Sequence, residues 1–221
     1  MMSRKTDDIF TVARKRMINE QIVGRGITNE DIVRVMSGLH RHHFVDEALI
    51  NQAYTDAPLS IGEGQTISQP YIVALMTQSL LLTGQERVLE IGTGCGYQTV
   101  ILSKIAKKVH TIERYKMLAM KARQRFIGYG LKNIVMRVGD GSVGWQEAAP
   151  FDRILATCAS PKSPQIFLDQ LAPAGILVIP CSEKNGHQSL MRITKKDNGY
   201  RSENLGECCF VKMIGKKGFR K

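Results

Sequence analysis

The chain has 221 residues, the usual size of a single domain and enough to bury a substantial core. Hydrophobic residues make up 43% of the sequence and charged residues 23%, as in ordinary water-soluble globular proteins. No run of about 18 apolar residues occurs, and the first residues do not resemble a signal peptide. We therefore expect no membrane span and a cytoplasmic location.

Basic residues exceed acidic ones and give a formal net charge of +11. Between Lys104 and Arg137 the only acid is Glu113, although this stretch is rich in lysine and arginine. Such a basic face attracts nucleic acids or acidic peptides, or it is simply solvated. Because no nucleic-acid-binding motif accompanies the charge, we expect no nucleic-acid partner. We also expect a monomeric protein.

The five cysteines show neither a C-x-x-C pair nor the even count of a disulfide framework. They are more typical of small buried thiols in a reducing compartment.

The first predicted elements are helical and span residues 11–52. Thr28 and Asp31 resemble a capping box with Asp in place of Glu. Apolar residues then recur at helical spacing, at positions 32, 35, 36 and 39.

Three histidines, His40, His42 and His43, lie close together within this segment. Their spacing is not that of two metal ligands one α-helical turn apart, and no cysteine or carboxylate cluster accompanies them. We therefore expect structural or surface histidines and no metal site.

The stretch GEGQTISQP, residues 62–70, is unusual because it offers glycines, hydroxyls and amides but no His, Lys or Cys. Gly62 and Gly64 are expected to loosen the backbone, and Pro70 to stiffen it before a helix that begins near Ile72. Glu63 is its one carboxylate. A catalytic role for this loop would thus need a reaction that requires no general base.

From residue 85 onward, strands alternate with helices, which predicts an α/β fold with a mostly parallel, doubly wound Rossmann-like sheet. Five parallel strands are expected, at residues 87–91, 109–113, 134–138, 151–156 and 176–180. Residues 189–194 and 208–214 are expected to form an antiparallel pair, with a turn near Asn198.

The strongest motif is the glycine turn Glu90-Ile91-Gly92-Thr93-Gly94-Cys95-Gly96, which follows the first of these strands. Its spacing is not the G-x-G-x-x-G of dinucleotide folds. Glu90 would repel a phosphate at this turn and suits a cationic ligand instead.

Two more acids follow the next strands. Glu113 can accept hydrogen bonds from both ribose hydroxyls of a nucleoside, and Asp140 can accept one from an adenine amine. Three acids at three successive strand ends fit a nucleoside bearing an amino-acid cation, and S-adenosylmethionine is such a ligand.

Over residues 14 to 215 the chain resembles the protein-L-isoaspartate O-methyltransferases. The resemblance rests on segments of similar sequence, which are Arg16–Ile22, Arg25–Ile27, Arg41–Val45, Gly62–Pro70, Val88–Gly96, Val138–Gly141 and Phe151–Asp152. Among methyltransferases the Gln-Thr-Ile-Ser-Gln-Pro loop is specific to that family.

The resemblance implies methyl transfer from S-adenosylmethionine to the free carboxylate of isoaspartyl residues in damaged proteins, which is a repair reaction. It implies one methyltransferase domain, with a helical N-terminal part (1–84) and a cofactor-binding core (85–221). It assigns Ser68 as the catalytic residue, and Ile67, Ser68 and Val211 as substrate-binding residues. The cofactor-binding residues would be Gln65, Thr66, Ile67, Glu90, Gly92, Gly94, Gly96, Glu113, Asp140 and Gly141.

The chain departs from the family pattern at two places. Thr157–Pro161 replaces a run of smaller residues, and Lys212 stands where a proline is usual after Val211, which replaces a rigid turn by a flexible basic residue. The departures leave room for a dedicated methyltransferase that acts on the aspartate of one peptide.

Two further alternatives stay open. Cys158 and Cys181 stand at strand ends where cytosine-C5 methyltransferases keep a nucleophile, which would make the chain a nucleic-acid methyltransferase. The chain can also be a cofactor-binding module without catalytic activity.

Overall fold

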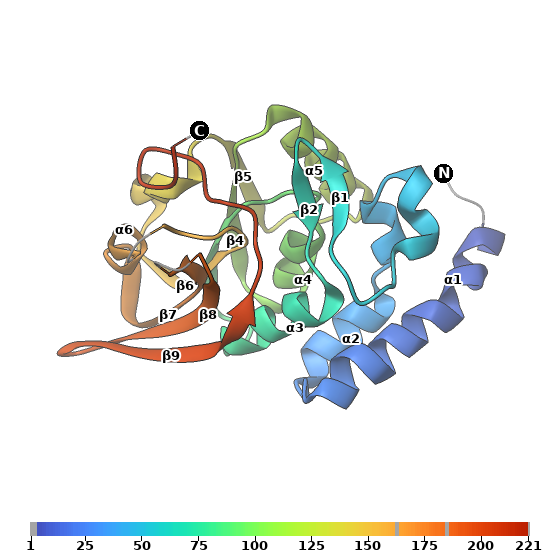
Figure 1. The fold of residues 1–221 in the computed structure, drawn as a ribbon, viewed down its shortest axis with the longest axis horizontal. Coiled ribbons are helices and arrows are strands. Elements are labelled where there is room, and N and C mark those ends of the chain that lie inside the picture. The colour runs from blue at the N-terminus through green and yellow to red at the C-terminus, as the bar shows by residue number, and fades with distance from the viewer. Residues whose placement is uncertain (1–3, 162–163, 184–185, 221) are drawn as a thin grey trace. The chain divides into compact units, whose positions relative to one another are not determined.

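The structure is a computed structural model that describes residues 4–161, 164–183 and 186–220 (Figure 1). The chain divides into two compact units, Met1–Gln78 and Ser79–Lys221. None of the helices in these described ranges is long and apolar enough to span a membrane.

The first unit is helical, as the sequence predicts, but its helices are short and of several kinds. The α-helices are α1 (Arg4–Arg16) and α2 (Glu30–Gly38). Between and after them come a π-helical turn at Met17–Ile22 and three 3-10 segments at Val23–Arg25, Arg41–Phe44 and Glu47–Gln52, before the two strands and the helix described below. The apolar residues Ile32, Val35, Met36 and Leu39 are buried, in agreement with their helical spacing.

The start of α2 differs from the predicted capping box. Asn29, not Thr28, is the N-cap residue, and its side-chain oxygen accepts a hydrogen bond from the Ile32 N–H at 3.1 Å. The Thr28 and Asn29 N–H groups both donate to the Gln78 side chain. The prediction failed because asparagine, at the next position, is a better N-cap residue than threonine.

Residues 62–70 are more ordered than the loosened loop predicted from their glycines. Strands β1 (Leu59–Gly62) and β2 (Gln65–Ile67) form an antiparallel hairpin, and helix α3 (Pro70–Ser79) follows. The two turn residues, Glu63 and Gly64, have φ of 54° and 67°. Positive φ at both positions gives the twist that a tight hairpin turn needs, so Gly64 shapes the turn instead of loosening it.

The second unit is built on a seven-stranded sheet with the strand order β5-β4-β3-β6-β7-β8-β9. Its parallel strands are β3 (Arg87–Ile91), β4 (Lys108–Glu113), β5 (Ile134–Val138), β6 (Phe151–Ala156) and β7 (Leu171–Ser182). After β5 the chain returns to the other side of β3, so the strand order reverses there. Ligands of open α/β sheets bind at the carboxyl ends of the strands beside such a reversal.

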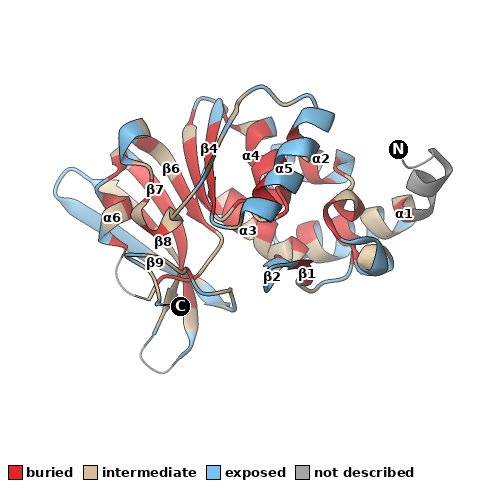
Figure 2. Cartoon of the chain, turned by 90° about the horizontal axis from the view of Figure 1, so that it is seen from above, coloured by how far each residue is buried: buried red, intermediate tan, exposed pale blue. Residues whose placement is uncertain are grey.

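The antiparallel end of the sheet was only partly predicted. Strands β8 (Gln188–Lys196) and β9 (Gly199–Cys208) form a hairpin that turns at Asp197–Asn198, as expected from the sequence. The second strand, however, is β9 and not residues 208–214. Most residues of β9 are polar and exposed (Figure 2), because an edge strand is held by its main-chain hydrogen bonds and needs no apolar face.

Helices α4 (Tyr97–Ile105) and α5 (Lys116–Gly128) pack against β4, and α6 (Gln165–Leu168) packs against β7. Strands β3, β4, β6 and β7 are buried along most of their length (Figure 2). A cluster of apolar side chains fills the core here, including Leu89, Ile91, Ile112, Phe151, Ile154 and Leu177. This core includes Ile91, Ile112 and Ala156 and so holds the carboxyl ends of β3, β4 and β6 in a fixed arrangement. The predicted α/β sheet with a helical N-terminal segment is confirmed.

Candidate active site

The glycine turn between β3 and α4 is closely packed from both sides. Gly92, Gly94 and Gly96 all have positive φ, at 95°, 55° and 89°. A Cβ at Gly96 would lie 2.7 Å from the Phe126 ring, and one at Gly92 would overlap the Thr157 hydroxyl. Both positions therefore require glycine, and the main chain of the turn stays open to a ligand at the carboxyl edge of the sheet.

Glu113, at the end of β4, lies directly beside this turn. Its Oε2 accepts a hydrogen bond from the Gly94 N–H at 2.7 Å, and its Oε1 accepts one from the Tyr115 N–H at 2.9 Å. Burial raises the pKa of Glu113, whereas the hydrogen bonds from these N–H groups lower it. A carboxylate held in this way keeps further lone pairs with which it can accept from a pair of hydroxyls.

Glu90, at the end of β3, is fully buried. Its Oε2 accepts hydrogen bonds from the Thr99 and Thr111 hydroxyls at 2.5 and 2.6 Å, and the Thr93 hydroxyl lies 2.6 Å from that of Thr111. Burial, with a smaller contribution from the nearby Glu113 charge, raises the pKa of Glu90 to about 8. Its Oε1 is buried and has no hydrogen-bond partner within the described part of the chain. Glu90 thus supplies negative charge beneath the turn only when a cation or another donor favours its ionised form.

Asp140 follows β5 and caps the short 3-10 turn Gly141–Val143. Its Oδ1 accepts from the Ser142 N–H and hydroxyl at 2.9 and 2.7 Å. Gly141 begins this turn, and a Cβ there would lie 2.8 Å from Ile91 Cγ2. Although burial opposes ionisation, these hydrogen bonds and that of the Lys216 N–H lower the pKa of Asp140, so it is a carboxylate at neutral pH.

Sequence reasoning missed the C-terminal segment that lies on Asp140. The Lys216 N–H donates to Asp140 Oδ2 at 2.8 Å, and the Lys217 N–H donates to the Ser142 hydroxyl at 3.0 Å. The Arg114 guanidinium donates to the Ile214 carbonyl at 3.1 Å. Residues 214–217 therefore lie against Asp140, Ser142 and Arg114. The spacing Gly215-x-x-Gly218 was the available signal, because a Cβ at either glycine would overlap neighbouring atoms.

Val211 pairs with the segment that follows β6. The Val211 carbonyl accepts from the Ala159 N–H at 2.9 Å, and the Met213 N–H donates to the Ala159 carbonyl at 2.9 Å. Lys212, between them, is exposed, and its ammonium lies 5.2 Å from the centre of the Phe219 ring. Lys212, where the family usually has proline, thus leaves the hydrogen bonds between residues 211–213 and Ala159 intact. The side chain of Lys212 contacts Phe219 in the C-terminal segment.

The remaining predicted site residues belong to the first unit and lie together on its hairpin. Strand β2 consists of Gln65, Thr66 and Ile67. Ser68 comes directly after it, two residues before α3 begins. Arg41, which is fully buried, donates to the Ser68 carbonyl at 2.8 Å and to the Ala53 carbonyl at 2.7 Å. No N–H of the described residues donates to the Ser68 hydroxyl, so Ser68 does not act as a helix cap here.

Burial makes the two strand-end cysteines poor nucleophiles. It raises the pKa of the Cys158 thiol to about 12, with a further contribution from the Glu113 carboxylate, and that of the Cys181 thiol to about 11. The reactive species of cysteine is the thiolate, which is almost absent at neutral pH when the pKa is so high. This result argues against the cysteine-dependent alternative.

Comparisons with known proteins agree with these features. Residues 12–218 match the family model "Protein-L-isoaspartate(D-aspartate) O-methyltransferase (PCMT)". A protein-L-isoaspartate O-methyltransferase of Trichlorobacter lovleyi is 52% identical over 212 residues, covering 96% of this chain and 97% of that protein. One of Geobacter metallireducens is 49% identical, covering 95% and 97%.

Two solved structures have the same fold. A protein-L-isoaspartate O-methyltransferase with 25% identity has a TM-score of 0.84 and covers 93% of this chain and 67% of the other. A protein from Plasmodium falciparum described as a putative protein-L-isoaspartate O-methyltransferase, in complex with S-adenosyl-L-homocysteine, has 28% identity and a TM-score of 0.79, covering 91% and 98%. The match over nearly the whole chain shows that it belongs to the protein-L-isoaspartate(D-aspartate) O-methyltransferase family.

Proposed function

We propose that the chain transfers the methyl group of S-adenosylmethionine to the free carboxylate of L-isoaspartyl residues in damaged proteins or peptides. Within the structure, the main support is the group formed by the glycine turn, Glu90 and Glu113 at the carboxyl edge of β3 and β4, where the strand order reverses. This is the place at which α/β sheets bind nucleotides and related ligands.

The residues at this edge fit the cofactor chemically. Gly92, Gly94 and Gly96 keep side chains out of the turn, and Glu113 is oriented by two N–H groups to accept from the ribose hydroxyls. Glu90 adds the charge that suits an amino-acid cation, and its buried Oε1 lacks a donor among the described residues.

Asp140 and Gly141 would hold the adenine end of the cofactor. The Asp140 carboxylate is already oriented by the Ser142 N–H and the Lys216 N–H. On this proposal the C-terminal segment holds the Asp140 carboxylate in one position, in which it accepts a hydrogen bond from the adenine amine.

When bound, S-adenosylmethionine supplies a methyl group on a positively charged sulfur, which is a strong electrophile. The nucleophile is the isoaspartyl carboxylate, whose pKa of about 4 leaves it ionised at neutral pH. No general base is needed, which explains a catalytic loop without His, Lys or Cys. The task of the protein is to exclude water and align the carboxylate.

On this proposal Ser68 is the catalytic residue, and Gln65, Thr66 and Ile67 contribute to cofactor binding. Ile67 and Ser68 contact the substrate, and Val211 holds its main chain. A neutral hydroxyl and neighbouring N–H groups can hold a carboxylate without adding a competing charge. The hydrogen bonds from Arg41 to the Ser68 and Ala53 carbonyls support the idea that Ser68 is held in a defined position.

The test is a methylation assay with labelled S-adenosylmethionine and two peptides that differ only in an isoaspartyl or aspartyl linkage. A second isoaspartyl peptide of unrelated sequence and a sample of tRNA are included. We expect base-labile label on both isoaspartyl peptides and almost none on the others. Equal labelling of the aspartyl peptide would favour a dedicated aspartate methyltransferase, and label on tRNA alone would overturn the proposal.

Replacing Ser68 by Ala should lower turnover by about 10- to 1000-fold, similar to the loss of one preorganised hydrogen-bond donor in other enzymes. Cofactor affinity should change much less, because the hydroxyl acts on the substrate carboxylate. Ser60→Ala is the matched control, since Ser60 is an exposed serine on the partner strand of the same hairpin. Wild-type turnover in Ser68→Ala, measured by steady-state kinetics, would remove Ser68 from the reaction.

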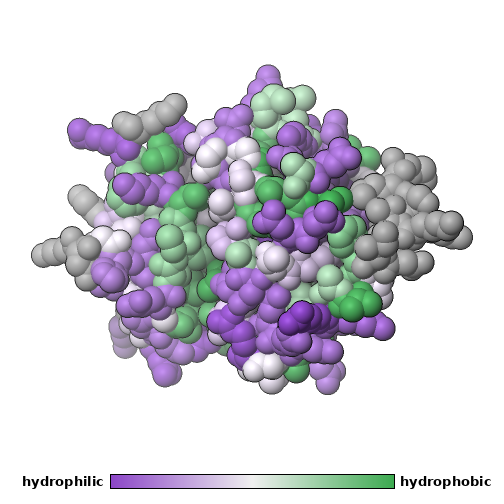
Figure 3. Space-filling view, turned by 45° about the vertical axis from the view of Figure 1, so that its right-hand side comes forward, coloured by the Kyte–Doolittle hydropathy of each residue, from purple (hydrophilic) through white to green (hydrophobic). Residues whose placement is uncertain are grey.

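We further propose that the chain acts in the cytoplasm, as a monomer and as one methyltransferase domain. The five cysteines are free thiols, which agrees with a reducing compartment. Hydrophilic residues cover much of the face shown in Figure 3, and apolar residues form only small patches there. Light scattering during gel filtration tests the monomer, for which a mass near 24.7 kDa is expected.

A further inference from the structure

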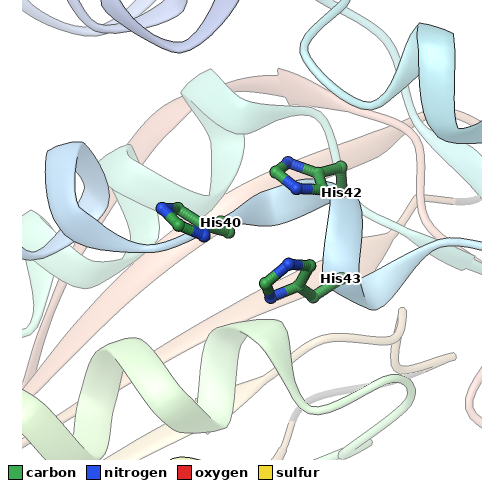
Figure 4. A group of neighbouring side chains, drawn as sticks. All are labelled: His40, His42 and His43. Carbon is green, nitrogen blue, oxygen red and sulfur yellow. The ribbon is translucent and has the colours of Figure 1, made fainter. Parts of the chain in front are cut away.

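The three histidines of the first unit form a compact cluster. His40, His42 and His43 each offer a ring nitrogen, and these nitrogens lie within 4.8 Å of one another. Figure 4 shows the three rings arranged around a shared space. The ring centroids of His42 and His43 are 4.5 Å apart, and those of His40 and His43 are 5.1 Å apart.

The local backbone explains why the histidines meet. In an α-helix His40 and His43, at i and i+3, would also lie on one face, but His42, two residues from His40, would point elsewhere. The structure instead has a 3-10 turn at Arg41–Phe44, with His40 as its N-terminal cap. In a 3-10 turn residues i and i+3 eclipse each other, so His40 and His43 lie on one side. Arg41 and Phe44, also three apart, are both buried.

His42 has the hydrogen-bonding pattern of a metal ligand held by a neighbouring group. Its Nδ1 lies 2.8 Å from the Tyr54 hydroxyl, and both residues are buried. Histidines that bind metals usually have their second ring nitrogen held in this way, which fixes the orientation of the ring. The contact with Tyr54 therefore fixes the orientation of the His42 ring within the cluster.

We propose that His40, His42 and His43 form a binding site for a divalent transition-metal ion of the Zn²⁺ type. Imidazole nitrogens suit zinc, and three histidines with an open fourth position are a known ligand set. Nitrogens bound to one zinc ion at about 2.0–2.1 Å lie about 3.3 Å apart in a tetrahedron. The cluster thus needs to contract by about 1 to 1.5 Å, which rotation of the side chains of the half-buried His40 and His43 can supply.

The location of the site gives it a structural consequence. The same 3-10 turn contains Arg41, which donates to the Ala53 and Ser68 carbonyls. A metal ion bound to three residues of this turn and its cap would restrain the backbone from which Arg41 extends. Zinc should therefore raise the melting temperature of the protein, as any ligand that binds only the folded state does.

The test uses zinc ions alone with the full chain. Competition with a chromophoric chelator measures the dissociation constant, and zinc X-ray absorption identifies the ligands. We expect one zinc ion per chain with a nitrogen and oxygen shell at about 2.0–2.1 Å, and no sulfur at about 2.3 Å. The double variant His40→Ala/His43→Ala should bind at least about 100-fold more weakly, and Tyr54→Phe about 10- to 100-fold more weakly.

His187→Ala is the matched control, because His187 is an exposed histidine outside the cluster, and its zinc affinity should equal that of the wild type. If the double variant melts at a lower temperature than the wild type without zinc, the single variant His43→Gln provides the same comparison at a half-buried position. A sulfur shell, no binding, or unchanged affinity in these variants would overturn the proposal. None of these outcomes depends on methyl transfer.

Discussion

Replacing Glu90 by Gln should change how the stability of the second unit depends on pH. Glu90 is fully buried, and its pKa is raised from 4.5 to about 8. A carboxyl group with a raised pKa in the folded state contributes its full stability below the unfolded pKa. That contribution is lost as the pH rises through the folded pKa. For Glu90 the affected range is therefore about pH 4.5 to 8.

The size of the effect follows from these two pKa values. Each pKa unit corresponds to about 1.4 kcal/mol, so the contribution of Glu90 should fall by about 3–4 kcal/mol between pH 5 and pH 8. Gln keeps an oxygen that can accept from the Thr99 and Thr111 hydroxyls but does not ionise. The free energy of unfolding of Glu90→Gln should therefore lack this decline.

Urea unfolding at several pH values provides the assay. Trp145 is the one tryptophan of the sequence and lies in the same unit as Glu90, so its fluorescence reports on the relevant part of the chain. The informative quantity is the difference in unfolding free energy between wild type and Glu90→Gln. If that difference is constant from pH 5 to pH 8, Glu90 titrates alike in the folded and unfolded states, and the burial argument is refuted.

Three further predictions concern the same unit. Glu113→Ala should weaken S-adenosylmethionine binding by about 1–3 kcal/mol, as expected when partners of a charged hydrogen bond are left unpaired. Calorimetry measures this affinity, and an unchanged dissociation constant would show that Glu113 does not contact the cofactor. Cys158→Ala and Cys181→Ala should retain methyl transfer, because thiols with pKa values of about 12 and 11 are protonated at neutral pH; loss of activity in a folded variant would restore the cysteine-nucleophile alternative. Gly215→Ala should destabilise the unit by about 1–3 kcal/mol in urea unfolding, because the new Cβ would overlap the Asp140 carboxylate and the Ser142 hydroxyl. Gly128→Ala is the control and should not destabilise the unit, because the space around Gly128 is open. Equal stability of the two variants would contradict the packing argument.

The parallel strands were predictable because each is a short apolar run bounded by turn signals. The predicted residues 87–91 and 134–138 coincide with β3 and β5, and the predicted end at Glu113 coincides with the end of β4. Since the carboxyl ends of adjacent parallel strands meet at one edge, the gathering of Glu113 and the glycine turn followed from strand order alone.

Other features depend on contacts that a single sequence does not reveal. Strand β9 is polar because it lies at the sheet edge, so no apolar alternation marked it. The C-terminal segment reaches Asp140 through the main-chain N–H of Lys216, and any residue type other than proline supplies such a group. The histidine cluster depends on a 3-10 turn, and the choice between a 3-10 turn and an α-helix is made by packing.

The two acids beside the glycine turn illustrate why sequence position does not determine chemical role. Glu90 and Glu113 lie at or next to the end of a strand, and both have a raised pKa, yet their donors differ. Glu113 is held by two main-chain N–H groups, one of them from the turn itself, which fix the position of its carboxylate. Glu90 is held by threonine hydroxyls inside the unit and is largely protonated at neutral pH, because its pKa is about 8.

A cationic cofactor at the turn would favour the ionised form of Glu90 and cause it to release a proton. Calorimetric titration with S-adenosylmethionine in buffers of different ionisation enthalpy measures that proton. Wild type should release close to one more proton than Glu90→Gln at pH 7, and equal release by the two proteins would show that the Glu90 charge does not respond to the cofactor.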